Sequence, residues 1–196
     1  MSVATPTVDE LEDLLLACRY GDLEDVQQFV DRFGPDPLND ARDERGNTVL
    51  HMVAGNGHIE TLEYLLRHVP PALLSARNDA RSTALHWAAL NSHLAVAQAL
   101  VKLPGGPGAD LIDAKNEAGR TPLGEAENVG WEDGAKWFVE VMKLEENQKG
   151  EELQVAEDAE DAEKIEVEIQ DAEGQIAKMT IGQRPAGESS IPPSAP

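Results

Sequence analysis

Cysteine, aromatic residues, basic residues and long apolar runs are all scarce in this sequence. The single cysteine, Cys18, excludes an intramolecular disulfide and favours a reducing compartment. No run approaches the roughly 20 apolar residues that a membrane-spanning helix requires. Residues 1–10 have neither the basic start nor the apolar stretch of a signal peptide. We therefore expect a soluble intracellular protein.

The shortage of aromatic residues also limits the kind of core that the chain can build. They make up 4% of the sequence, whereas hydrophobic residues as a whole make up 41%. Such a core consists mainly of closely packed Ala, Val and Leu, which favours helices stacked on helices. With 196 residues, the chain fits one ordinary domain, or a smaller domain with a tail.

Basic residues are outnumbered, with 16 Lys and Arg against 37 Asp and Glu and a net charge of −21. Phosphates are bound by clustered Lys and Arg, so a surface of this charge repels nucleic acid and anionic lipid. We expect no direct nucleic-acid binding and no membrane binding. The composition favours a basic protein as the partner.

The acidic charge is densest near the C-terminus. Residues 145–196 carry 14 acidic and 4 basic side chains, and the last 13 residues are rich in Gly, Pro and Ser. Low hydrophobicity with dense like charge does not recover the entropy lost on ordering. We predict a mostly disordered acidic tail over 149–196 and a flexible N-terminus over 1–9. An alternative is that apolar residues of the tail order on a partner, namely Ile165, Val167, Ile169, Ile176, Met179 and Ile181.

A short motif recurs between the two termini. It begins at Thr48, 35 residues later at Thr83, and 38 residues after that at Thr121. The three copies are Thr48-Val49-Leu50-His51, Thr83-Ala84-Leu85-His86 and Thr121-Pro122-Leu123-Gly124. Each Thr can cap a helix, and an amphipathic second helix follows the motif. An earlier partial copy places Gly21 36 residues before Gly57. Period and motif resemble the ankyrin-repeat family.

This resemblance implies an all-α fold, an ankyrin-repeat solenoid of four repeats over residues 10–148. Each repeat is a pair of antiparallel helices with a β-hairpin finger, and the first and last repeats are caps. The expected repeats are about 10–42, 43–77, 78–115 and 116–148. Arg81 occupies the finger position that Gly46 and Gly119 hold in the other copies. A left-handed backbone costs a non-glycine residue about 1 kcal/mol, so the shape of the second finger stays open.

Histidines recur with the repeat and raise the question of a metal site. They are His51, His58, His86 and His93, with His68 outside the set. Their places in the repeat favour a structural role, in which they bond Thr side chains and the backbone of adjoining repeats. Cys18 aligns with Ala54 and Ala89, which predicts a small buried residue and not a nucleophile.

Other signs of chemistry are absent from the sequence. The glycine-rich stretch 105–108 lacks the Lys-Ser/Thr that completes a phosphate-binding loop. The acidic pairs of the tail lack the spacing of a calcium loop. No acid–base pair or triad can be assembled. We predict a protein that is not an enzyme, with no cofactor, no metal and no small-molecule substrate.

Two strings narrow the resemblance within the family, namely Leu50-His51-Met52 and Ala84-Leu85-His86-Trp87-Ala88. They resemble those of the fungal ankyrin-repeat chaperones dedicated to the KH-domain protein of the small ribosomal subunit, ribosomal protein S-three. The likeness covers residues 10–145 by motif and the tail by composition. It implies a chaperone, cytoplasmic and nuclear, that shields this newly made basic protein during ribosome biogenesis. The alternatives are a generic ankyrin adaptor for another intracellular protein and an inhibitor that occupies an enzyme's active site.

The family also implies where a partner binds, because ankyrin domains use the finger tips and the concave face of the inner helices. Trp87 is either an aromatic anchor for the partner or a packing residue within the inner-helix layer. The predicted partner-binding residues are Arg19, Tyr20, Glu44, Arg45, Asn47, Asn56, Asp79, Ser82, Trp87, Leu90, Asn91, Glu117, Arg120 and Asn128.

Overall fold

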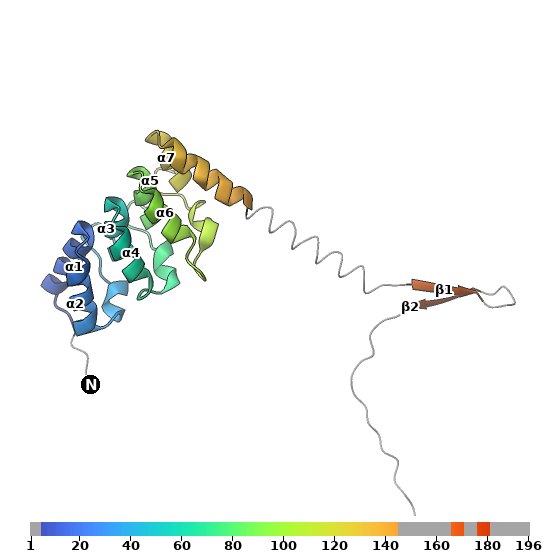
Figure 1. The fold of residues 1–196 in the computed structure, drawn as a ribbon, viewed down its shortest axis with the longest axis horizontal. Coiled ribbons are helices and arrows are strands. Elements are labelled where there is room, and N and C mark those ends of the chain that lie inside the picture. Colours follow the sequence, from blue (N-terminus) through green and yellow to red (C-terminus); the bar gives the residue numbers. More distant parts are fainter. Residues whose placement is uncertain (1–4, 145–165, 171–175, 181–196) are drawn as a thin grey trace, which may run out of the picture. The chain divides into compact units, whose positions relative to one another are not determined.

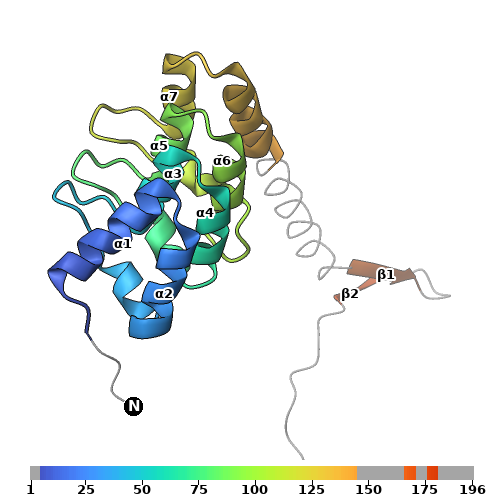
Figure 2. The ribbon, with the colours of Figure 1, turned by 60° about the vertical axis from the view of Figure 1, so that its left-hand side comes forward.

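The computed structural model describes residues 5–144, 166–170 and 176–180. The chain divides into two units, Met1–Glu145 and Glu146–Pro196. The first unit is a row of paired helices, as the motif predicts (Figure 1). Its inner helices lie side by side in one layer and its outer helices in a second layer, which is the arrangement of a solenoid (Figure 2).

The first repeat consists of α1 (Val8–Tyr20), α2 (Leu23–Phe33) and the short 3-10 helix η1 (Asp36–Asn39). A capping box begins α1. The Glu10 N–H donates to the Thr7 hydroxyl at 3.3 Å, and the Thr7 N–H donates to the Glu10 carboxylate at 2.8 Å. This cap explains why the helix begins within residues 1–9, which we expected to be flexible.

The two middle repeats share one plan. The second consists of α3 (Val49–Asn56), α4 (Ile59–Leu66) and η2 (Pro71–Ser75), and the third of α5 (Ala84–Leu90), α6 (Leu94–Val101) and η3 (Gly108–Leu111). Thr48 and Thr83 cap the two inner helices, as the motif predicts. Because the same signal begins α3 and α5, the two helices enter the inner layer in the same way.

The last repeat closes the solenoid with α7 (Pro122–Asn128) and a helix over residues 132–144. The Thr121 hydroxyl accepts the Gly124 N–H at 3.1 Å, and Pro122 occupies the first helical position, where its missing N–H needs no partner. Phe138 is fully buried and packs edge-on against Trp131. Aromatic side chains therefore close this end of the core.

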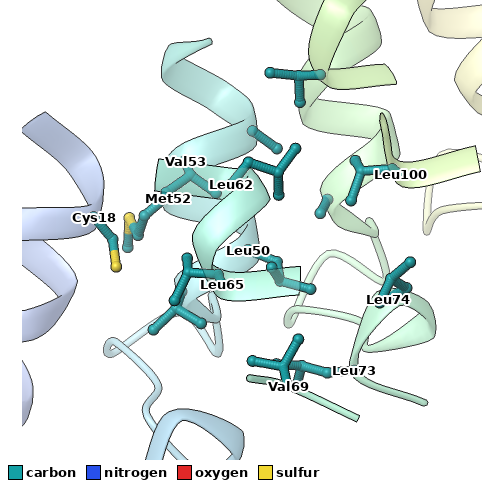
Figure 3. Packing of buried hydrophobic residues seen from close by; sticks show 14 of the residues in the cluster. Cys18, Leu50, Met52, Val53, Leu62, Leu65, Val69, Leu73, Leu74 and Leu100 are labelled. Atoms are coloured by element: carbon teal, nitrogen blue, oxygen red, sulfur yellow. The ribbon is translucent and has the colours of Figure 1, made fainter. Parts of the chain in front are cut away.

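One continuous core runs between the inner and outer layers. Figure 3 shows side chains from three successive repeats in contact, with Cys18 of α1 beside Met52 and Val53 of α3. Cys18, Ala54 and Ala89 are each 0% exposed, which confirms that the aligned position holds a small buried residue. Burial raises the pKa of the Cys18 thiol to about 12, so this side chain is not a nucleophile at neutral pH.

The second finger keeps the left-handed backbone of the other two. Arg81 has a φ of 57°, against 72° for Gly46 and 75° for Gly119. Ser92 likewise has a φ of 60°, at the position where Gly57, with a φ of 78°, ends the preceding inner helix. The repeat therefore imposes its turn geometry even where a side chain makes that geometry costly.

The second unit contains an antiparallel pair of strands, β1 (Glu166–Gln170) and β2 (Ile176–Thr180). Glu166 lies opposite Thr180, and Gln170 lies opposite Ile176. These strands fall in the segment that we predicted to be mostly disordered. Apolar and polar residues alternate over residues 165–170, a pattern typical of a strand. The rest of that prediction, and the boundary near residue 148, lie outside the described residues.

Candidate partner-binding surface

The three fingers are short hairpins joined to one another. Within them, Asp43 N–H donates to Asn47 O, Asn78 N–H to Ser82 O and Asn116 N–H to Arg120 O, at 3.0–3.1 Å. Between them, Asp79 N–H donates to Arg45 O at 3.0 Å, and Glu117 N–H donates to Ala80 O at 2.9 Å. These bonds between neighbours hold the fingers in a row, so their tips form one continuous edge.

The predicted finger residues differ in how far their side chains are exposed. Glu44, Arg45, Asp79, Glu117 and Arg120 are exposed along this edge. Their charges are mixed, with three carboxylates and two guanidinium groups. A partner that met them would therefore have to match both signs, which favours specificity over simple attraction.

Asn47 and Ser82, two other predicted contact residues, are only 2% and 9% exposed. Asn47 donates to the Asp43 carboxylate at 2.8 Å and accepts from the Asn78 amide at 2.8 Å. The Ser82 N–H donates to the side-chain oxygen of Asn78 at 2.9 Å. Asn47 therefore joins the first finger to the second, whereas Ser82 closes the second finger on itself. Neither residue belongs to the proposed surface.

The inner helices expose residues at two equivalent positions of the repeats, one held by Asn56 and Asn91 and the other by Leu90 and Asn128. Asn56, Asn91 and Asn128 are exposed, as is Leu90 at 47%. The Asn56 amide donates to Met52 O at 2.8 Å, and the Asn91 amide donates to Trp87 O at 3.0 Å. These bonds fix the two side chains at the ends of their helices.

Trp87 packs on the preceding repeat and keeps only part of its ring accessible. The ring meets His51 edge-on, with centroids 5.9 Å apart. A Cβ placed on Gly55 would lie 2.6 Å from the Trp87 ring, so this glycine makes room for it. We predicted Trp87 to be either a partner anchor or a packing residue within the inner-helix layer, and this geometry favours packing. The ring is only half-buried, so part of it remains at the surface.

A cleft of about 610 Å³ lies where α1 meets the first finger and α3. It joins three of the predicted residues, Arg19, Glu44 and Arg45. It is also lined by residues that sequence reasoning missed, namely Glu12, Leu15, Leu16, Arg42, Asp43 and Met52. The helical spacing of residues 12, 15, 16 and 19 is the signal that would have found its α1 side. Tyr20, which we predicted on the concave face, does not line this cleft.

A buried carboxylate supports the third finger. Glu125 is 5% exposed, and its Oε1 accepts from the Asn116 amide at 2.7 Å and from Arg120 Nε at 3.0 Å. Its Oε2 has no hydrogen-bond partner in the described part of the chain. Glu125 is not among the residues that the sequence predicted to matter. The structure makes it the residue that orients Arg120.

The repeating histidines connect the repeats, as predicted. Thr48 N–H donates to Nδ1 of His51 at 3.2 Å, so the proton lies on Nε2, which donates to Ser82 O at 2.9 Å. His86 does the same with Thr83 and the Arg120 carbonyl. Burial lowers the pKa of His51 to about 4 and also lowers the pKa of His86. Both are therefore neutral at pH 7.

The other two repeating histidines bond to the preceding repeat. Nε2 of His58 lies 2.9 Å from Arg19 O, and Nε2 of His93 lies 3.2 Å from Gly55 O. Within residues 5–144, 166–170 and 176–180, no three His, Cys, Asp or Glu side chains are grouped closely enough to hold a metal. These same residues form no helix long and apolar enough to cross a membrane.

Comparison with known proteins matches this chain to ankyrin-repeat proteins. A family model for ankyrin repeats, in three copies, matches residues 14–111. An ankyrin repeat-containing protein of Schizosaccharomyces pombe is 35% identical over 60 residues, which are 31% of this chain and 40% of that protein. The ankyrin repeat-containing protein YAR1 of Saccharomyces cerevisiae is 36% identical over 63 residues, 31% of this chain and 32% of YAR1. The aligned region thus spans less than half of each curated relative.

The fold also matches a solved complex. A chain in the crystal structure of the yeast ribosomal protein Rps3 with its chaperone Yar1 is 30% identical to this one, with a TM-score of 0.64. The match covers 69% of this chain and 95% of that chain. It therefore includes nearly the whole of the matched chain.

Proposed function

Since the chain belongs to the ankyrin-repeat family, we propose that it is a dedicated chaperone for a basic ribosomal protein of the small subunit, S-three. It binds this protein when newly made and shields it during ribosome biogenesis. The observation that carries the proposal is the match to a chain of the Rps3–Yar1 complex over 95% of that chain's length. We call the bound ribosomal protein the client.

Charge supports the same proposal independently. A basic ribosomal protein without its RNA attracts stray polyanions and aggregates, whereas this chain has a net charge of −21. An acidic binder covers the basic surface, speeds the encounter electrostatically and can later give way to rRNA. The exposed finger edge and the cleft beside α1 are the surfaces that we assign to the client.

The test reverses two carboxylates on the finger edge. Asp79→Lys with Glu117→Lys should weaken binding to purified S-three about tenfold, because two favourable charge contacts become repulsive. Isothermal titration calorimetry measures the affinity, and circular dichroism checks that the helical content is unchanged. The matched control is Glu60→Lys with Glu63→Lys, the same change in charge on exposed residues of α4, away from the fingers.

The outcomes separate the proposal from its alternatives. The control should bind within about twofold of wild type, because its changed residues touch neither surface. A wild-type protein that does not bind S-three overturns the proposal. In that event, affinity purification that recovers a signalling factor or an enzyme supports the adaptor or the inhibitor instead.

A further inference from the structure

The N-terminal end of the repeat unit carries a second cleft, between α1 and α2. It measures about 540 Å³ and is lined by residues of α1, of α2 and of the turn between them. These two helices form the N-terminal end of the row (Figure 2). Leu16 lines both this cleft and the one beside the first finger. The other α1 residues of the two clefts lie on different faces of the helix. We call the second cleft the end cleft.

The floor of the end cleft is apolar. Phe29 and Phe33 are 8% and 5% exposed, with ring centroids 4.9 Å apart. The more exposed Leu16, at 47%, and Tyr20, at 74%, line the same cleft. The outer face of a terminal repeat is normally polar, because it has no neighbour to cover it. Exposed Leu and Tyr above an apolar floor are instead typical of a surface that binds a partner.

The rim of the end cleft is acidic. Glu10, Asp13, Asp22 and Asp25 line it, with Arg32 as the single basic lining residue. Arg32 is already paired, since its Nη1 lies 2.9 Å from Glu10 Oε1. Among the described residues, the carboxylates of Asp13, Asp22 and Asp25 have no ion-pair partner. The rim therefore has unmatched negative charge around an apolar floor.

We propose that the end cleft binds a basic amphipathic segment of the same client, so that the client covers α1 from two sides. This inference rests on the proposed function. Lys and Arg side chains of the segment would meet the rim, and its apolar side chains would meet Tyr20 and the floor. A second copy of this chain is the wrong occupant, because its net charge of −21 would be repelled by the rim. Leu16, common to both clefts, makes the two surfaces continuous.

The test reverses the rim charge without touching the fingers. Asp13→Lys with Asp25→Lys should weaken binding of full-length protein to purified S-three about tenfold. The control is again Glu60→Lys with Glu63→Lys on α4, which changes the net charge by the same amount. Circular dichroism and thermal unfolding identify any variant that fails to fold. Calorimetry at a single salt concentration compares all three proteins.

A second variant tests the apolar contact separately. Tyr20→Ser removes a ring that is 74% exposed and lies outside the hydrophobic core. The variant should therefore fold normally and bind about fivefold more weakly. This variant remains informative if the two lysines destabilise α1 or α2. Because the loss involves no charge, it should also persist at high salt, where long-range attraction is screened.

The results distinguish this proposal from the function on which it rests. If wild type binds S-three and the finger variant is weakened, but the rim and Tyr20 variants match the control, the end cleft is not a client site and the function stands. If the rim and control variants are weakened equally, only general charge acts, and the end-cleft proposal is overturned. If wild type does not bind, both proposals fail together.

Discussion

At the scale of single residues, two side chains occupy backbone conformations that favour glycine. Arg81 and Ser92 both have positive φ, where L-residues clash with their own backbone. Arg81 is exposed, so its side chain gains little packing in return. Its conformation is fixed by the finger hairpin, in which its N–H donates to Asn78 O at 2.8 Å.

Arg81→Gly should therefore stabilise the protein. Glycine relieves the left-handed conformation, and its greater freedom in the unfolded chain offsets part of the gain, which leaves about 0.5–1 kcal/mol. Urea unfolding followed by circular dichroism measures the difference. Gly46→Ala is the reverse control and should destabilise by about 1 kcal/mol or more, since the new Cβ would also lie 3.0 Å from Asp79 Oδ1. If the Arg81→Gly protein is less stable than wild type, the claim that the backbone at Arg81 is strained is wrong.

At the scale of elements, the repeating histidines couple each inner helix to the next repeat. His51 bonds its own helix start through Nδ1 and Ser82 O of the next finger through Nε2. A neutral ring satisfies both bonds, whereas a protonated ring would place N–H against the Thr48 N–H. Packing of the repeats and the protonation state of His51 are therefore linked.

Acid should weaken the fold through this link. The folded pKa of His51 is about 4, below the usual value of 6.5, so the unfolded chain binds the proton first as pH falls. The histidine's contribution is fully present above pH 6.5 and is lost towards pH 4, at about 1.4 kcal/mol per pH unit. Urea unfolding between pH 7 and pH 5 measures the slope.

The matched variant is His51→Gln, which cannot titrate in this range. It should be less stable than wild type at pH 7, because the bond between repeats is weakened, and its stability should fall less steeply with acid. Comparison of the two slopes removes the contribution of carboxylates common to both proteins. Equal slopes would show that His51 does not couple folding to pH.

At the scale of the whole molecule, a compact repeat unit is joined to a strongly acidic C-terminal segment. The first unit runs to Glu145 and has its own continuous core. Residues 145–196 carry a net charge of −10, almost half of the total. We infer that the repeats supply the specific contacts and that the segment adds long-range attraction for a basic client.

Removal of residues 149–196 should separate these roles. The shortened protein should keep nearly the same melting temperature and should associate with S-three more slowly at low salt. The difference should shrink as salt rises, because attraction is screened within about 8 Å at physiological ionic strength. Stopped-flow rates at two salt concentrations provide the measurement, with the Asp79→Lys, Glu117→Lys protein as a comparison for dissociation. If the truncation abolishes binding equally at both salt concentrations, residues 149–196 make specific contacts with the client.

The sequence alone determined the repeats, the Thr caps, the structural role of the histidines and the burial of Cys18. These features depend on local spacing, since a helix start or an aligned small residue recurs in every copy. The same logic found most of the exposed finger residues. It also offered ordering of the apolar residues around both strands as an alternative, although it favoured disorder there.

Only the tertiary structure decided which predicted residues are buried and where on the surface the exposed ones lie. Asn47 is buried where Asn78 of the next finger bonds to it, and Ser82 is buried where its carbonyl oxygen meets His51 of the preceding repeat. Tyr20 lies in the end cleft because α2 packs beside α1. Arg81 takes a left-handed backbone because its neighbours fix the hairpin. Glu125 is buried against the third finger. Each of these outcomes depends on contacts that form when a finger or helix packs in the folded repeat or against its neighbour, and the spacing of the motif carries no information about them.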